Sequence, residues 1–358
     1  MNRRDFVRTL AVSGAVLATT GPGSVRAAGL SNAAGQSVRI PLGMDNFAVR
    51  ALGLKGRALV DFAADLKLDT LFITDLPGLG SLEASAATEL QKYAADKGLA
   101  ILLGSWSICP TSVRFKRDWG TAEEHLALGL KLAKAVGSPL FRVVLGGRED
   151  RATPGGIEAR IADTVRVLQS QRSLARDLGI KVAIENHAGD MTARELVGLM
   201  ETAGRDWVGA NLDSGNALWT LEDPRQSLEI LGPYTISTSL RDSAVWATEK
   251  GAKVQWTAFG EGGIIDWKAY FQRYAQLCPQ AAVNVETIGG FAVEFPYLEA
   301  DFWKNFPKKP AAELAQFEAL VRRGRAIPQH DSNDPKSQRG ELERSLRYLR
   351  EVIGLGVR

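Results

Sequence analysis

Three short apolar runs of the sequence each end in a carboxylate. The runs read KVAIE, WVGANLD and AAVNVE, and they end at Glu185, Asp213 and Glu286. Runs of this length and composition are typical of parallel strands that are buried on both faces. The carboxyl ends of such strands meet at one face of an α/β barrel, where substrate-facing side chains gather. We therefore expect these three carboxylates to lie together at one site.

A cluster of three carboxylates suits metal binding and proton transfer. Carboxylate oxygens bind divalent cations such as Mn²⁺, Mg²⁺ or Zn²⁺. A cation held in this way can bind adjacent sugar oxygens and polarise a carbonyl, and a second carboxylate can then remove a proton from the neighbouring carbon. The pattern is thus suited to metal-assisted proton transfer next to a carbonyl. For any one of these residues alone, the alternative is a solvated carboxylate in a loop.

The rest of the chain alternates short apolar runs with amphipathic helical segments. Eight strands followed by helices predict a (β/α)8 TIM barrel over residues 37–290. A doubly wound open sheet is the alternative, but no glycine-rich phosphate loop follows the first strand. The expected strands are 37–43, 69–75, 99–106, 140–145, 181–185, 207–212, 235–240 and 281–286.

Two segments exceed a minimal barrel. Residues 245–263 are expected to form a hairpin, inserted between the seventh strand and its helix, with a turn at Lys250 and Gly251. Residues 291–358 are predicted to form a C-terminal helical extension that packs on the barrel.

The amino terminus reads as a targeting signal. Arg3 and Arg4 form a twin-arginine pair, an apolar stretch follows, and Val25-Arg-Ala27 offers small residues for cleavage. We expect residues 1–27 to be a signal peptide, residues 28–36 a spacer, and the mature protein to be periplasmic. No stretch of the sequence reaches the ~20 apolar residues that span a bilayer, so no stable membrane insertion is expected.

The composition argues against nucleic acid as a partner. The net charge is +3, from 44 basic and 41 acidic residues, and the sequence has no long run of like charge. The two cysteines, Cys109 and Cys278, stand in no metal-ligand spacing. An exported protein could oxidise them, but two unrelated structural thiols are the favoured interpretation.

Between about residues 38 and 290 the chain resembles the xylose-isomerase-like TIM-barrel superfamily of sugar phosphate isomerases and epimerases. Ketose 3-epimerases and apurinic endonucleases are among its relatives. Each motif is short, and it is their order and spacing that carry the resemblance. The motifs are IENH at 184–187, NLDSGN at 211–216, LRD at 240–242, GEGGIIDW at 260–267 and VE at 285–286.

The resemblance implies a single divalent metal held by a Glu, an Asp, a His and a second Glu, with the two Glu as acid and base. Carried over, the ligands are Glu185, Asp213 and Glu286, and the catalytic pair is Glu185 and Glu286. The family places the His three residues before an Asp, and this sequence has Ser239 there. Serine is a poor neutral ligand, so we expect weak metal binding or a replacement ligand. Gln255 of the hairpin is the candidate.

Four further side chains are candidates for substrate binding. His187 lies two residues after Glu185 and should share its face of the strand. The others are Arg142 on the fourth strand, Arg241 after the seventh, and Trp106 at the end of the third. Each has a structural alternative: a buried histidine, an arginine paired with a carboxylate, or an indole used in packing.

Several functions remain open on this reading. The leading one is an isomerase or epimerase that acts on a free carbohydrate, since export argues against a phosphorylated intermediate. A keto-glycoside lyase would use the same groups. A non-catalytic periplasmic sugar-binding barrel with a degenerate metal site is the third, and Ser239 favours it. An apurinic endonuclease would need a cluster of histidines, and this chain has three in all.

Overall fold

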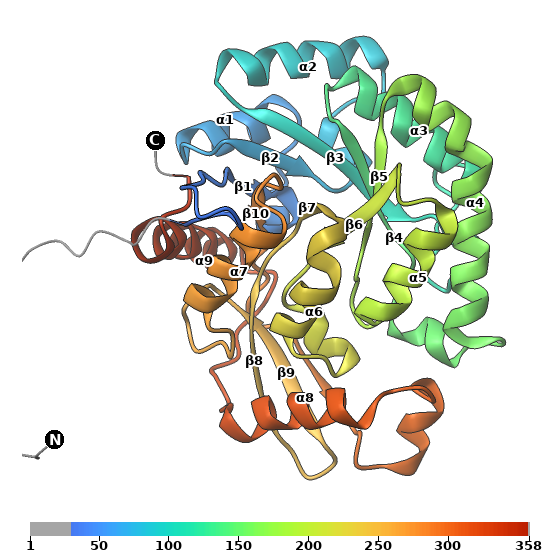
Figure 1. Cartoon of the computed structure of the whole chain (residues 1–358). Helices are drawn as coiled ribbons and strands as arrows, with labels where there is room; N and C mark the ends of the chain where they lie inside the picture. The colour runs from blue at the N-terminus through green and yellow to red at the C-terminus, as the bar shows by residue number, and fades with distance from the viewer. Residues whose placement is uncertain (1–29, 357–358) are drawn as a thin grey trace, which may run out of the picture.

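The computed structural model describes residues 30–356, so the predicted signal peptide lies outside the described residues. Eight parallel strands form a nearly closed barrel in the order β10-β1-β2-β3-β4-β5-β6-β7, and a parallel bridge between Leu240 and Val285 joins the two ends (Figure 1). This confirms the predicted TIM barrel. The strands are β1 Leu42–Asp45, β2 Thr70–Ile73, β3 Ala100–Ser107, β4 Leu140–Val144, β5 Lys181–Glu185, β6 Val208–Leu212, β7 Thr235–Thr238 and β10 Val283–Val285.

Along strand β5, the side chains alternate between the inside of the barrel and the helices outside it. Val182 and Ile184 belong to the main core between the strands and the helices. Ala183 belongs instead to a small cluster with Phe72 and Leu102 inside the barrel. Because side chains alternate along a strand, Glu185 shares the inner face with Ala183. The alternation of apolar residues along β5 therefore determines that the Glu185 carboxylate points into the barrel.

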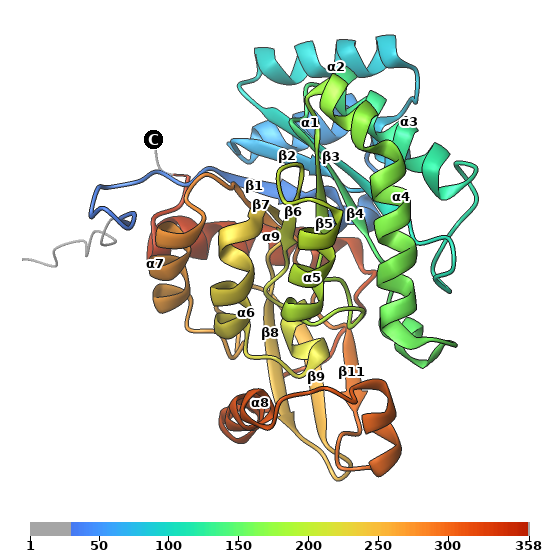
Figure 2. The ribbon, with the colours of Figure 1, turned by 45° about the vertical axis from the view of Figure 1, so that its right-hand side comes forward.

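Seven helices follow seven of the barrel strands and cover their outer faces (Figures 1 and 2). Helix α3 (Ala122–Ala135) begins with a capping box formed by Thr121 and Glu124: each side chain accepts a hydrogen bond from the backbone of the other residue. These helices are α1 Arg57–Asp65, α2 Ala84–Asp96, α3 Ala122–Ala135, α4 Gly156–Leu178, α5 Ala193–Ala203, α6 Pro224–Leu231 and α7 Trp267–Leu277.

The eighth helix of the ring comes from the end of the chain. Helix α9 (Pro335–Tyr348) continues into a π-helical turn, η7 (Leu349–Ile353), and lies beside α7 and β1 in Figure 1. Its Leu342 and Leu346 are buried in the main core, and Arg350 Nη2 donates to the carbonyl of Leu66 at the end of α1. The final helix, which the sequence assigned to an extension, thus completes the barrel between α7 and α1.

The inserted hairpin is present and carries a third strand. Strands β8 (Asp242–Ala247) and β9 (Ala252–Thr257) pair in antiparallel fashion, and β11 (Ala292–Phe295) adds to the other edge of β9. The sheet projects beyond the barrel with α8 (Ala311–Arg323) on one side (Figures 1 and 2). Pairing with β11 was not foreseen, because no turn in the sequence connects it to β9.

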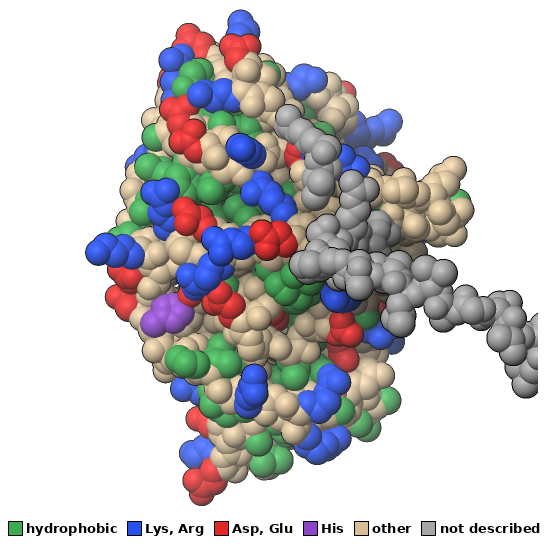
Figure 3. Space-filling view, turned by 90° about the vertical axis from the view of Figure 1, so that its left-hand side faces the viewer, with side chains coloured by type: hydrophobic (Ala, Val, Ile, Leu, Met, Phe, Trp, Pro, Cys, Tyr) green, Lys and Arg blue, Asp and Glu red, His purple; other side chains and the backbone are tan. Residues whose placement is uncertain are grey.

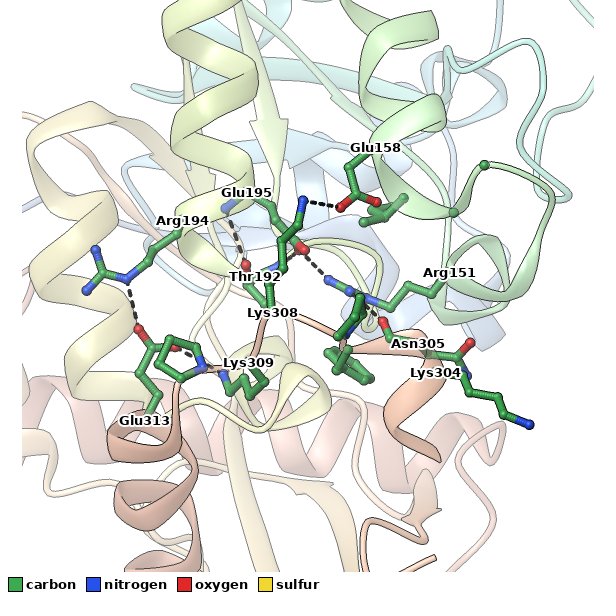
Figure 4. Close-up of a pocket in the computed structure, with 16 residues that line it drawn as sticks. Arg151, Glu158, Thr192, Arg194, Glu195, Lys304, Asn305, Lys308, Lys309 and Glu313 are labelled. Atoms are coloured by element: carbon green, nitrogen blue, oxygen red, sulfur yellow. Dashed lines mark hydrogen bonds and ion pairs between the residues drawn. The ribbon is translucent and has the colours of Figure 1, made fainter. Parts of the chain in front are cut away.

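Ion pairs fasten the segment between β11 and α8 to the barrel, around a cavity of about 510 Å³ (Figure 4). Lys308 Nζ lies 2.9 Å from Glu158 Oε1 at the start of α4, and Arg194 Nε lies 2.8 Å from Glu313 Oε1. Arg151 Nη1 donates to the carbonyl of Asn305. Each of the three acids in the lining, Glu158, Glu195 and Glu313, is paired with a cation of the lining, and the lining as a whole carries more cations than acids.

The outer surface mixes charges of both signs. On the face drawn in Figure 3, basic and acidic side chains alternate with apolar and neutral ones. None of the described helices is long and apolar enough to cross a membrane. Cys109 and Cys278 are buried free thiols, in line with two unrelated structural cysteines, and burial raises the pKa of Cys278 to about 12.

Two helical glycines allow the packing of the ring to be tested. A Cβ on Gly129 of α3 would overlap the buried ring of Phe141 on β4, whereas a Cβ on Gly198 of α5 would meet nothing within 4 Å. We expect Gly129→Ala to destabilise the protein by about 1–3 kcal/mol through overpacking. Gly198→Ala should stabilise it by about 0.5–1 kcal/mol through helix propensity. Urea unfolding of both variants measures these changes, and a stabilised Gly129→Ala variant would contradict the packing described here.

Candidate active site

The structure brings Glu185, Asp213 and Glu286 together inside the carboxyl-terminal mouth of the barrel. Glu185 ends β5, Asp213 directly follows β6, and Glu286 directly follows β10. Carboxylate oxygens of the three residues lie within 4.8 Å of one another, and all three side chains are buried. The strand-end pattern therefore located these groups correctly.

Arg142 holds Glu185 in its ionised form. From the inner face of β4 its Nε donates to Glu185 Oε2 at 2.7 Å, and Asn211 Nδ2 donates to the same oxygen at 2.7 Å. Burial alone would raise the pKa of Glu185, but the charges of Arg142 and Arg241 and the hydrogen bond from Arg142 together contribute to an opposite effect that outweighs it, and the pKa is lowered. The second oxygen, Oε1, receives only a 3.4 Å contact from Asn216 Nδ2. Glu185 thus keeps one carboxylate oxygen largely unused.

Arg241 lies between the other two carboxylates. Its Nη2 donates to Asp213 Oδ2 at 2.5 Å and also to Glu286 Oε2. The guanidinium carbon lies 4.3 Å from the centre of the Trp256 ring, which covers it from above. From the sequence, we expected Arg241 to lie at the mouth of the barrel, where it would either pair with a carboxylate or contact the substrate. The structure shows a side chain that is only 2% exposed, at the centre of the cluster.

Buried carboxyl groups outnumber the arginines in this cluster, so some of the carboxyl groups keep their protons at pH values where a free carboxyl group is ionised. Burial raises the pKa of Asp213 to about 7, with Glu185 adding to the effect and Arg241 opposing it. Burial also raises the pKa of Glu286 well above its usual value, and the neighbouring carboxylates add to the effect. Glu185 and Glu286 are therefore shifted in opposite directions. Such a divergence is typical of a base and an acid that work together.

Asp45 and Asn211 belong to the network but were missed in the sequence. Asp45 ends β1 as Glu185 ends β5, and it was overlooked because the first strand was expected to finish at residue 43. Asn211 precedes Asp213 by two residues and could have been found from the alternation of the strand. Ser239 Oγ donates to Asp45 Oδ2 at 3.1 Å and accepts from Asn211 Nδ2 at 3.1 Å. The Ser239 hydroxyl is therefore hydrogen-bonded on both sides within this network.

His187 is neutral and offers an acceptor. Its Nδ1 lies 2.6 Å from the carbonyl oxygen of Gly146, which can only accept, so Nδ1 carries the proton. Burial lowers the pKa of His187 to about 4 despite the attraction of Glu185. The edge of Trp106 packs against the imidazole, with the ring centres 5.2 Å apart. The remaining nitrogen, Nε2, has no hydrogen-bond partner among residues 30–356 and can accept a hydrogen bond from a hydroxyl group.

A cavity of about 260 Å³ lies over this site and includes His187 and Trp106 in its lining. Trp219, Trp256 and Phe291 form one wall, with ring centres 4.8–5.8 Å apart. The carboxylates do not line the cavity, and Arg241, which contacts Asp213 and Glu286, lies against the Trp256 ring of its wall. Cations outnumber acids in the lining, which includes Arg50, Arg114, Arg148 and Glu149.

Gln255 lies on β9 and uses its amide elsewhere. Its Nε2 donates to the carbonyl of Pro328 at 2.9 Å. The assignment of Gln255 as a replacement metal ligand stays a prediction, and this contact with the C-terminal segment gives the side chain a structural role.

By their spacing the three carboxylates could hold a metal ion, but Arg241 takes the place that the ion needs. A metal bound to Asp213 Oδ2 and Glu286 Oε2 would lie ~2.0–2.2 Å from each oxygen. Arg241 Nη2 already contacts both oxygens, so an ion and this nitrogen exclude each other. The fourth ligand is also missing, because Ser239 is engaged with Asp45. With Arg241 in this position, the residues do not fit a divalent metal.

A family model of xylose isomerase-like TIM barrels matches residues 60–290. The chain belongs to this family. The family's TIM-barrel architecture is the one described above. No curated protein sequence matches the chain.

Solved structures share this fold at low sequence identity. A xylose isomerase domain protein from Planctomyces limnophilus is 18% identical over 80% of this chain and 99% of its own, with a TM-score of 0.54. The IOLI protein with a bound zinc atom is 15% identical over 80% and 100%, with a TM-score of 0.54. D-Psicose 3-epimerase from Clostridium cellulolyticum H10 is 13% identical over 88% and 99%, with a TM-score of 0.55. At these identities the likeness shows the fold alone.

The buried carboxyl of Asp45 predicts a pH dependence of stability. Burial raises its pKa from 3.8 to about 6, so the folded state favours the protonated form. Its contribution to stability is full below pH 4 and is lost as the pH rises through 6. In Asp45→Asn, the amide keeps the acceptor for Thr74 and Phe47 and stays uncharged. We expect this variant to gain up to about 3 kcal/mol relative to the wild type between pH 4 and pH 7.

Urea unfolding of both proteins across this pH range measures the difference. Asp61→Asn is the control, because Asp61 is exposed and the hydrogen bond from Lys97 lowers its pKa. That variant should not gain stability as the pH rises. A constant difference between wild type and Asp45→Asn at all pH values would contradict the assignment.

Proposed function

We propose that the protein is a sugar isomerase or epimerase that moves a proton on the carbon next to a carbonyl group. Ionised Glu185 takes the proton through its unused Oε1, and protonated Glu286 returns one to the sugar. The single observation that carries the proposal is the opposite shift of the two pKa values within one cluster. Membership of the family supports the same type of reaction.

The cavity over the cluster suits a carbohydrate. The rings of Trp219, Trp256 and Phe291 offer apolar faces for sugar C–H groups. His187 Nε2 accepts a hydrogen bond from a hydroxyl, and Trp106 holds the imidazole in position. Arg142 acts through Glu185, whose ionised form it stabilises. We therefore assign Arg142 to positioning and His187 to substrate contact.

The metal dependence expected from the sequence is not carried into this proposal. The reaction needs a positive group near the carbonyl oxygen to stabilise the charge that develops there. Arg241 supplies a positive charge in the cluster, and its Nη2 takes the point where an ion would bind.

A sugar-binding barrel without catalysis is the second candidate, and one observation favours it. Glu185 and Asp213 are fully buried and do not line the cavity. Turnover therefore requires the groups that cover them to move, whereas binding in the cavity does not. A keto-glycoside lyase would use the same acid and base, with expulsion of a substituent after proton removal.

Deuterium exchange distinguishes these candidates. Incubation of ketoses and keto-glycosides with the mature protein in D₂O should incorporate deuterium next to the carbonyl, as followed by NMR. We expect Glu185→Gln and Glu286→Gln each to slow this exchange by about 10²–10⁴-fold, because each removes one proton-transfer group. Glu261→Gln alters a surface ion pair with Arg344 and should leave the rate unchanged.

Each outcome assigns a function. Exchange with formation of an epimer or aldose supports the proposal, and exchange with loss of a substituent identifies a lyase. Sugar binding without any exchange, in wild type and variants alike, would establish the non-catalytic barrel.

We also propose that the protein is exported to the periplasm and acts on sugars that carry no phosphate. The support is the twin-arginine pattern at Arg3 and Arg4. Replacement of both by lysine should retain the full-length chain in the cytoplasm, as seen by cell fractionation and immunoblotting. Unchanged export of the Arg3→Lys/Arg4→Lys chain would contradict this proposal.

A further inference from the structure

We propose that Arg241 is a built-in replacement for the metal ion, so that the site works with a guanidinium in the position of the cation. Its Nη2 takes the ion's place between Asp213 and Glu286, and its remaining N–H groups bind the carbonyl oxygen of the substrate. The metal part of this inference stands by itself, and the substrate part rests on the proposed function.

The first support is the position of the charge. Arg241 Nη2 contacts one oxygen of Asp213 and one of Glu286, the same two carboxylates that a metal would bridge. The guanidinium is planar and is held against the Trp256 ring at 4.3 Å, which limits its freedom to leave. Asn216 Nδ2 donates to the same Asp213 oxygen at 2.8 Å. This oxygen is therefore already satisfied by protein donors.

The second support is the change at the fourth ligand position. A histidine at residue 239 would bring an imidazole to the cluster. Ser239 instead donates to Asp45 Oδ2 and accepts from Asn211 Nδ2, both at 3.1 Å. The absence of a histidine at residue 239 and the presence of the Arg241 cation are thus complementary: the first weakens metal binding and the second supplies a positive charge.

The third support is a set of donors that the protein leaves unused. Arg241 Nε is buried and has no hydrogen-bond partner among the described residues. A buried donor without an acceptor costs free energy, so it calls for an explanation such as a ligand atom. Nη1 likewise donates to no described residue. A substrate carbonyl oxygen is an acceptor that fits such donors, and the guanidinium then stabilises the negative charge that develops on it.

Metal affinity tests the inference without any turnover. We expect the mature wild type to bind no stoichiometric Mn²⁺ or Zn²⁺ in equilibrium dialysis, and its thermal unfolding to be unaffected by either ion. The double variant Ser239→His/Arg241→Gln restores the missing ligand and clears the ion's position. We expect it to bind Mn²⁺ or Zn²⁺ roughly 100-fold tighter than the wild type, since a fixed positive charge no longer repels the ion.

Arg142→Gln is the matched control, because it removes another buried guanidinium from the same network but leaves Nη2 of Arg241 in place. It should gain no metal affinity. An equal gain in Arg142→Gln would show that net charge, not the position of Arg241, decides binding, and would overturn the inference. Stoichiometric, tight metal binding by the wild type, weakened by Glu185→Gln, would overturn it directly, even if the double variant failed to fold.

Substrate exchange gives an independent readout. If the wild type catalyses exchange, the rate should persist in EDTA, and Arg241→Lys should lower it by about 10²–10³-fold, because lysine retains the charge but lacks the planar donors. Loss of the wild-type exchange in EDTA would contradict the inference. Absence of exchange altogether would count against the proposed function, while the metal titrations would still decide the role of Arg241.

Discussion

The structure depends on a network of buried charges at the barrel mouth. Burial of an ion costs several kcal/mol, and removal of one partner of a buried pair typically costs about 3–5 kcal/mol, because the other is left uncompensated. Arg142 meets this requirement by contacting Glu185, and Arg241 meets it by contacting Asp213 and Glu286. Each partner comes from a different barrel strand or from the residues just after it, so the network requires these strands to keep their places.

Much of the barrel could be predicted because its signals are local. The alternation along β5 places Val182 and Ile184 against the helices and Ala183 inside the barrel, and the direction of Glu185 follows. The rule that parallel strands end at one face then brings the three carboxylates together. Even the capping box at Thr121 can be read from residues three positions apart.

The features that could not be predicted depend on contacts distant in sequence or on the direction of long side chains. Arg241 follows the seventh strand, and only its rotamer decides whether the guanidinium reaches water or the carboxylates. The pairing of β11 with β9 crosses about forty residues without a turn signal. Ser239 could be recognised as a departure from the family, but its hydrogen bonds involve Asp45, which the expected end of the first strand had left out, and Asn211, which had not been considered as a site residue.

The late position of α9 in the chain has a consequence for biosynthesis. The helix covers the region around the first and eighth strands, and Gly356 N donates to the carbonyl of Ile40 near the start of the described chain. The ring of helices therefore cannot close while the last segment is still inside the ribosome. Until then, the apolar outer surface at the joint between the first and last strands has no cover, which makes this joint a natural place for a chaperone to bind the nascent protein.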